Sequence, residues 1–350
     1  MIILILLFFS VFLATLPMIC LLLVVWWLDR YEREPLWLVG LVFAWGAVGG
    51  VLLGGIFSLA FTMPIHMVFG AQTAEIAGAV LIAPIIEEIT KGAVLLLIVF
   101  NRNFDNATDG FIYGAATGLG FGMVENLLYF SLGAASGDVP GWCGIVFMRT
   151  IFTAPMHALA SSCFGATLGY AKFQRSGAVR VVIPMLGLGI AMAIHFLWNS
   201  FAVASGAFSS EIPLLLSILI IIGEFTLIFA VFQASLFSES RMIRRELEKE
   251  ARAGLIPALH LKYLPYYFKR FQGGWLQPGV SKRRYIARAT ELAFRRAQRD
   301  RCGPDRRAFY ASEVSRLQQE VRQILEGARG PSPAHPLPPG PQAGGPGQVR

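Results

Sequence analysis

Seven apolar runs dominate this chain of 350 residues, and each is long enough to cross about 30 Å of hydrocarbon. Several contain Gly or Pro, which membrane helices tolerate better than soluble helices do. The first run lacks a basic leading segment and a small-residue cleavage site, so we expect it to be a retained span. The sequence predicts an all-α fold, a polytopic membrane bundle of about seven helices. The runs lie near residues 2–28, 36–61, 76–100, 110–132, 145–171, 180–204 and 213–237.

Charge divides the chain into a membrane part and a basic tail. Residues 1–237 carry 8 Lys and Arg against 12 Asp and Glu, whereas residues 238–350 carry 22 against 10. The last twenty residues are rich in Pro and Gly, a composition typical of disorder. We therefore expect a seven-helix transmembrane domain at 1–237, a basic helical tail at 238–330 and a disordered tail at 331–350.

The basic tail shows helical patterning, with Lys or Arg on most turns and aromatic residues interleaved at 263–270. Basic residues gain about 1 kcal/mol each beside anionic lipid. A nucleic-acid partner would need a recognition motif, and we find none. The composition favours anionic lipid or a cytoplasmic protein as the partner of the tail. The predicted tail helices span about 239–253, 282–301 and 305–328.

Basic residues alternate strictly between the predicted loops. The loops at 62–75, 133–144 and 205–212 contain no Lys or Arg, whereas the other loops and the tail do. By the positive-inside rule the N-terminus lies outside and the C-terminus in the cytoplasm. We expect a multi-pass protein of the cell membrane. The four cysteines are scattered, which favours neither a disulfide framework nor a thiolate metal site.

Three charged residues lie in the middle of the third predicted span: Glu87, Glu88 and, one turn later, Lys91. A charge at that depth costs at least about 2.5–3.5 kcal/mol on insertion scales, so such residues are rare and usually functional. Lys91 is interpreted as a charge partner, because the buried carboxylates would otherwise repel one another. The glutamate pair itself favours function over a structural role.

Further polar residues occur at similar depth in the next three spans. Counted at about 1.5 Å per residue, all of them fall in one layer between the midplane and the outer third of the membrane. Arg149 is interpreted as a charge partner that also contacts substrate. Asn126 is either an interhelical hydrogen-bonding residue or a substrate-binding one, and His157 alone could be a core histidine. The layer comprises Glu125 and Asn126 in the fourth span, Arg149 and His157 in the fifth, and His195 and Asn199 in the sixth.

A glycine stripe in the fourth span predicts that these helices pack closely. The glycines recur every four residues, a spacing that lets neighbouring backbones approach. Asn126 continues the same face. The stripe consists of Gly110, Gly114, Gly118 and Gly122.

Peptide-bond hydrolysis in a membrane needs a base to activate water, donors for the oxyanion and an acid for the leaving amine. Glu87 can serve as the base. His195 and Asn199, one turn apart, can serve as oxyanion donors. The chain contains no Gly-x-Ser-x-Gly, no His-Glu-x-x-His and no membrane Asp pair. Serine, zincin and aspartyl chemistry are therefore poorly supported.

The motifs Glu-Glu-x-x-Lys, Phe-x-x-x-Glu-Asn, a membrane His and His-x-x-Trp-Asn appear in this order in successive spans over residues 30–205. In these motifs the chain resembles the PrsW intramembrane proteases, distant relatives of the CAAX prenyl endopeptidases and of the Aph subunit of gamma-secretase. The resemblance implies cleavage of a single-span membrane protein such as an anti-sigma factor. It departs from the CAAX relatives, which have His at the position of Glu125. The implied catalytic set is Glu87, Glu88, Glu125, His157, His195 and Asn199.

Two mechanisms stay open at this point. In one, Glu87 activates water with help from Glu125 or His157, and no cofactor is needed. In the other, Glu88, Glu125, His157 and His195 bind zinc, which accepts such O and N ligands. The sequence favours the metal-free mechanism. A non-catalytic scaffold, or an ion or proton transporter using the carboxylates as a relay, is the alternative function.

Overall fold

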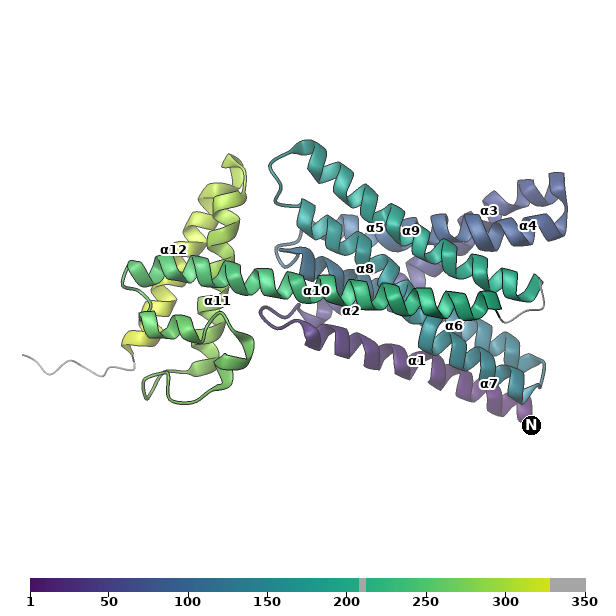
Figure 1. Cartoon of the computed structure of the whole chain (residues 1–350), viewed down its shortest axis with the longest axis horizontal. Coiled ribbons are helices and arrows are strands. Elements are labelled where there is room, and N and C mark those ends of the chain that lie inside the picture. Colours follow the sequence, from purple (N-terminus) through teal and green to yellow (C-terminus); the bar gives the residue numbers. More distant parts are fainter. Residues whose placement is uncertain (208–211, 328–350) are drawn as a thin grey trace, which may run out of the picture.

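The computed structural model describes residues 1–207 and 212–327, and within them the chain is helical, with no strand (Figure 1). Five helical segments of the described chain are long and apolar enough to cross a membrane. This confirms the predicted helical membrane bundle. The five are Ile2–Leu28, Leu36–Phe69, Val139–Ala171, Gly177–Gly206 and Ile212–Arg252.

The predicted third and fourth spans are also helical, but they are not among these five segments. The third begins at the end of α4 (Ala71–Ala77) and includes α5 (Ala83–Ile98), and the fourth corresponds to α6 (Ala107–Ala135). Both carry charged site residues, and α6 is rich in glycine. The total of seven spans remains a prediction.

At three places a π-helical turn of five residues connects two consecutive α-helices. The turn η1 (Gly46–Gly50) joins α2 (Leu36–Trp45) to α3 (Val51–Phe69). The other two turns are η2 (Gly78–Ile82), between α4 and α5, and η3 (Arg149–Thr153), between α7 (Val139–Met148) and α8 (Ala154–Ala171). Such turns are rare and often accompany functional sites. Two of the three, η2 and η3, lead directly into helices that carry polar residues of the membrane layer, α5 and α8.

Helix α6 lies at the centre of the bundle, and its glycines make this possible. A Cβ atom on Gly114 or Gly118 would lie 2.3 or 2.2 Å from the main-chain oxygens of Ser161 and His157 in α8. On another face, a Cβ on Gly120 would lie 2.0 Å from the main-chain oxygen of Phe43 in α2. The backbone contact predicted from the glycine stripe is confirmed. It brings the fourth-span carboxylate of Glu125 against the fifth span.

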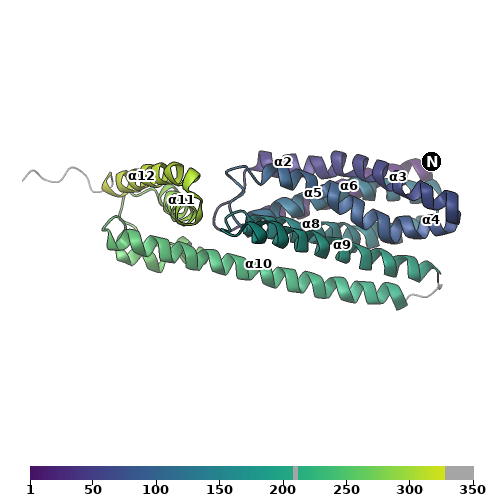
Figure 2. The ribbon, with the colours of Figure 1, turned by 90° about the horizontal axis from the view of Figure 1, so that it is seen from above.

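The remaining long helices, α1 (Ile2–Leu28), α9 (Gly177–Ala207) and α10 (Ile212–Arg252), surround this centre. Helix α10 continues without a break from the bundle into the tail (Figures 1 and 2). The boundary predicted at 237/238 therefore falls inside a helix.

The tail has a hydrophobic core of its own, at one end of the bundle (Figure 2). Its helices are α11 (Lys282–Arg301) and α12 (Pro304–Glu326), and two short 3₁₀ helices, η4 (Ala258–Lys262) and η5 (Tyr267–Phe271), lie between α10 and α11. The core includes Ile243, Leu247, Trp275, Tyr285, Leu292 and Leu317. The predicted disordered segment at 331–350 lies outside the described residues.

Candidate active site

The centre of the site is a buried ion pair on α5. Pro84 stands at the start of this helix, directly after the π-helical turn η2. One turn on, Glu88 and Lys91 share a face at i, i+3 spacing. Lys91 Nζ lies 2.5 Å from Glu88 Oε1, and the lysine is 0% exposed. The predicted charge partnership of Lys91 is thus with Glu88.

Glu88 also receives hydrogen bonds from two other helices. His195 Nδ1 of α9 lies 3.0 Å from Glu88 Oε1, and Ser161 Oγ of α8 donates to Glu88 Oε2 at 3.2 Å. Because the carboxylate accepts, the proton of a neutral His195 lies on Nδ1. The lone pair of Nε2 then faces Glu87, whose Oε2 is 3.8 Å away.

A second buried carboxylate, Glu125 of α6, is paired in a similar way. His157 Nε2 and Arg149 Nη2 both lie 2.7 Å from Glu125 Oε2. Lys91 Nζ is 3.1 Å from the other ring nitrogen of His157, Nδ1. A charged lysine donates to Nδ1, which leaves the His157 proton on Nε2 for Glu125. One continuous network therefore joins the two carboxylates through Lys91 and His157.

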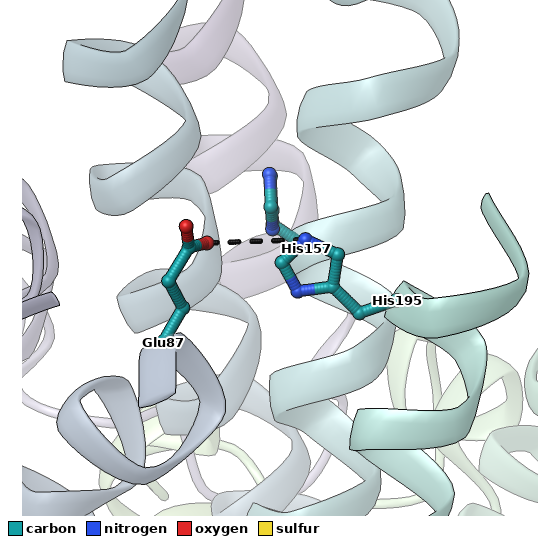
Figure 3. A group of neighbouring side chains, drawn as sticks. All are labelled: Glu87, His157 and His195. Atoms are coloured by element: carbon teal, nitrogen blue, oxygen red, sulfur yellow. Dashed lines mark ion pairs between the residues drawn. The ribbon is translucent and has the colours of Figure 1, made fainter. Parts of the chain in front are cut away.

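Glu87 differs from the other two glutamates in lacking a close partner. Its Oε2 is buried and has no hydrogen-bond partner among the described residues. Its side chain is 15% exposed, against 1% for Glu88. Figure 3 shows Glu87 facing His195, with His157 beside it. The two imidazole rings meet edge to face, with centroids 4.7 Å apart. Glu87 is therefore the least engaged of the three carboxylates within the described chain.

Arg149 connects the carboxylate network to Asn126. Its Nε donates to Asn126 Oδ1 at 3.1 Å, and its guanidinium lies 3.8 Å from the ring centroid of Tyr129. The amide nitrogen of Asn126 is buried and has no hydrogen-bond partner in the described chain. Both residues thus lie beside Glu125, and their predicted contact with substrate stays a prediction.

Asn199 is not brought into this network. Its Nδ2 donates to the main-chain oxygen of Ala79 in η2 at 2.8 Å. The oxyanion role predicted for Asn199 needs a free amide donor, and here one of its two amide hydrogens is bonded to the backbone. Asn199 thus bonds to the backbone of η2, although one helical turn places it on the same face of α9 as His195.

Two contacts of the site were not anticipated. Ser161 follows His157 by one helical turn, so the i, i+4 spacing could have identified it. The ring of Phe121, in the second motif, lies 5.1 Å from the His157 ring and 4.5 Å from Lys91 Nζ. The aromatic face stabilises the lysine charge by a cation–π interaction in a low-dielectric site.

Three residues could hold a metal ion. Ligand atoms of Glu87, His157 and His195 all lie within 4.8 Å of one another. Zinc accepts this donor set. The orphaned Oε2 of Glu87 and the Glu88-oriented imidazole of His195 suit a metal centre. His157 would have to exchange a partner, because both of its ring nitrogens are engaged.

A protein-family model described as "PrsW family intramembrane metalloprotease" matches residues 34–231, more than half of the chain. The matched range includes all the residues of the site described above. The chain belongs to the PrsW family. The resemblance seen in the four sequence motifs is confirmed, and with it the place of the chain in a family of intramembrane peptidases.

Curated relatives agree with this family. The chain is 32% identical over 146 residues to Protease PrsW of Geobacillus kaustophilus, a match that covers 41% of this chain and 59% of the relative. It is 29% identical over 168 residues to Protease PrsW of Bacillus subtilis, covering 48% and 70%. To Protease PrsW of Clostridioides difficile it is 27% identical over 181 residues, covering 49% and 73%. No solved structure shows a significant match to the chain.

Proposed function

We propose that this protein is an intramembrane endopeptidase that hydrolyses a peptide bond in single-span membrane proteins, of the anti-sigma-factor type. The observation that carries the proposal is the contrast among the three glutamates. Glu88 and Glu125 are held by ion pairs and hydrogen bonds, whereas Glu87 has a buried oxygen to which no described residue bonds. A general base must bind water rather than a permanent cation, and Glu87 meets that condition.

The other residues take roles that follow from their hydrogen bonds. Glu88 orients His195 so that the Nε2 lone pair faces the water held by Glu87. The proton that Glu87 takes from the water can pass to the leaving amine, while Glu125 and His157 form the ion-paired network beside them. Asn126, with its unpartnered amide, and Arg149 bind the substrate carbonyl. A donor of this kind contributes about 2.7–4 kcal/mol of transition-state stabilisation in a low-dielectric site.

The dependence on metal is the second part of the proposal. If the protein binds zinc, Glu87, His157 and His195 would hold it, and the ion would supply Lewis-acid polarisation of the carbonyl or of water. The glutamate-only arrangement keeps the contacts of His157 with Lys91 and Glu125, whereas zinc binding would require His157 to exchange one of them. Metal analysis of the purified protein tests this choice, because stoichiometric zinc would contradict the metal-free mechanism.

The test of activity is incubation of the purified protein with a panel of single-span peptides, read by mass spectrometry. We expect the wild type to cleave and Glu87→Gln to be inactive while still folded. Glu75→Gln, the same change at an exposed site on α4, is the matched control and should retain activity. Cleavage by Glu87→Gln would refute the role of Glu87. If no form cleaves any peptide and the protein carries ions across the membrane of lipid vesicles, the result would favour an ion or proton transporter instead.

The position of the cut tests the proposed topology, with the N-terminus outside and the tail in the cytoplasm. The site then lies in the outer half of the membrane. We expect cleavage nearer the extracytoplasmic end of the substrate span. A cut mapped close to the cytoplasmic surface would contradict this orientation.

A further inference from the structure

Two phenylalanines of the tail are exposed although the tail has its own core. Phe268 is 72% exposed and Phe271 is 67% exposed, and both belong to η5. Residues 266–271 are called the aromatic loop below. Exposed apolar groups of this kind mark interaction sites when they cluster.

The aromatic loop is held against the end of the first membrane helix. Tyr31, three residues beyond α1, donates its hydroxyl to the Pro265 main-chain oxygen at 3.2 Å, and its ring lies 6.5 Å from that of Tyr267. The guanidinium of Arg30 lies 5.5 Å from the centroid of the Phe268 ring. The loop therefore lies at the level where α1 leaves the membrane.

The same level is marked by exposed tryptophans. Trp27, at the end of α1, and Trp37, at the start of α2, are 56% and 63% exposed. Tryptophans at helix ends are enriched at the boundary between hydrocarbon and headgroups. The exposed phenylalanines of the aromatic loop thus continue an aromatic belt that the membrane helices begin.

The loop is rigidly attached to the tail rather than free to withdraw. Arg270 is buried, and it donates from Nε to the Leu264 main-chain oxygen at 2.6 Å and from Nη2 to Thr290 Oγ1 at 2.9 Å. Its guanidinium also lies 4.9 Å from the Tyr31 ring centroid. Arg270 fixes the loop to α11, so the exposed side chains cannot fold into the core without breaking these bonds.

The charges around the loop are mainly positive. Lys262 and Lys269 are exposed, and Lys269 Nζ lies 4.7 Å from the Tyr266 ring centroid. The neighbouring connection adds Arg30 and the exposed Arg33, while two of its acids, Asp29 and Glu34, are buried. Basic residues beside exposed aromatics suit an anionic lipid surface.

We propose that the aromatic loop is an interfacial membrane anchor. Phe268 and Phe271 enter the boundary between headgroups and acyl chains, and Lys262, Lys269 and Arg33 contact anionic headgroups. The anchor sets the position of the tail at the membrane surface. It is independent of the proteolytic activity.

The test uses the full-length protein in lipid nanodiscs, with Phe268 replaced by the photo-crosslinking analogue p-benzoylphenylalanine. We expect irradiation to give lipid adducts, detected by mass spectrometry of the intact protein. The same analogue at Ala253, an exposed residue just beyond the end of α10, is the control and should give few adducts. Equal yields at the two positions, or cross-links to a second copy in place of lipid, would overturn the anchor.

Bilayer composition tests the role of the charges. We expect more lipid adducts at position 268 in bilayers containing phosphatidylglycerol than in pure phosphatidylcholine. Lys269→Glu should remove most of that difference. An adduct yield that does not change with lipid charge would refute the contact with anionic headgroups.

Discussion

At the residue scale, Lys91 is the group on which the site depends most. It is fully buried and touches Glu88, His157 and the face of Phe121. Removing one partner of a buried ion pair leaves an uncompensated charge. Lys91 therefore neutralises Glu88 and also orients the His157 ring.

We expect Lys91→Met to lower the free energy of unfolding by about 3–5 kcal/mol, because Glu88 would be left charged and unpaired. The double variant Glu88→Gln/Lys91→Met removes both charges and should recover most of that stability without recovering activity. Thermal unfolding in detergent measures both variants. A double variant as unstable as Lys91→Met would contradict a role in charge compensation.

Asn126 and Asn199 provide a second comparison at this scale. Asn126→Asp keeps the acceptor for Arg149 Nε but removes the unpartnered amide donor. We expect it to lower kcat by about 10²–10³, the cost of one oxyanion donor. Asn199→Asp is the matched control, and it should change kcat less because its amide bonds to Ala79. The reverse order of the two losses would support the oxyanion role of Asn199.

At the element scale, the contact between α6 and α8 positions Glu125 against His157. We expect Gly118→Ala to lower both stability and activity, because the added methyl group would lie 2.2 Å from the His157 main-chain oxygen. Gly40→Ala, on an exposed face of α2 with no atom within 4 Å of the added methyl group, is the control. Unfolding midpoints and peptide cleavage are compared for the two variants. Normal activity in Gly118→Ala would show that α6 and α8 can move apart without loss of peptide cleavage.

Particular residues show how far sequence reasoning reaches. Spacing and charge were sufficient to place Glu87, Glu88, Glu125, His157 and His195 together, because a membrane leaves few reasons for buried charge. The glycine stripe predicted the close packing of the helices that carry these residues. The bond from Asn199 to Ala79 could not be foreseen, because it goes to a carbonyl in a π-helical turn. Such a turn adds no distinctive residue pattern to an apolar run.

The end of the seventh apolar run shows a second limit. The composition of the chain changes from apolar to basic near residue 237, and this change marks where the chain passes from the membrane into water. The backbone of α10 continues to Arg252, since charged residues such as Glu, Lys and Arg form helices well. The core of the tail was also missed, because its apolar residues come from segments far apart in the sequence.

At the scale of the whole molecule, a buried ion pair joins the tail to the bundle. Arg295 Nη1 of α11 lies 2.8 Å from Asp105 Oδ2, in the connection between α5 and α6. The Thr108 hydroxyl of α6 donates to the Glu239 carboxylate of α10, also across this junction. The position of the tail thus depends on residues immediately before and within the central helix.

We expect Arg295→Gln to loosen the tail, because Asp105 would keep a buried charge without its partner. Limited proteolysis should then cut sooner in the segment between α10 and α11. Arg307→Gln, an exposed change on α12, is the control and should leave the digestion rate unchanged. Identical digestion of the wild type, Arg295→Gln and Arg307→Gln would mean that the ion pair does not hold the tail against the bundle.

The connection between α1 and α2 also makes stability depend on pH. Glu34, between α1 and α2, is 5% exposed and accepts a hydrogen bond from the Tyr113 hydroxyl. Burial, and then the charge of Asp109, raise the pKa of Glu34 from 4.5 to about 12. The folded chain therefore binds a proton that the unfolded chain releases above pH 4.5. Raising the pH must favour the unfolded state through this group, since the proton is lost only on unfolding.

We expect the unfolding midpoint of the full-length protein in detergent to fall from pH 5 to pH 8. Glu34→Gln is neutral at every pH and keeps an acceptor for the Tyr113 hydroxyl, so this variant should show a smaller fall over the same range. Glu75→Gln removes an exposed carboxyl of α4 and should follow the wild type. A Glu34→Gln variant with the same pH dependence as the wild type would show that Glu34 is ionised in the folded protein.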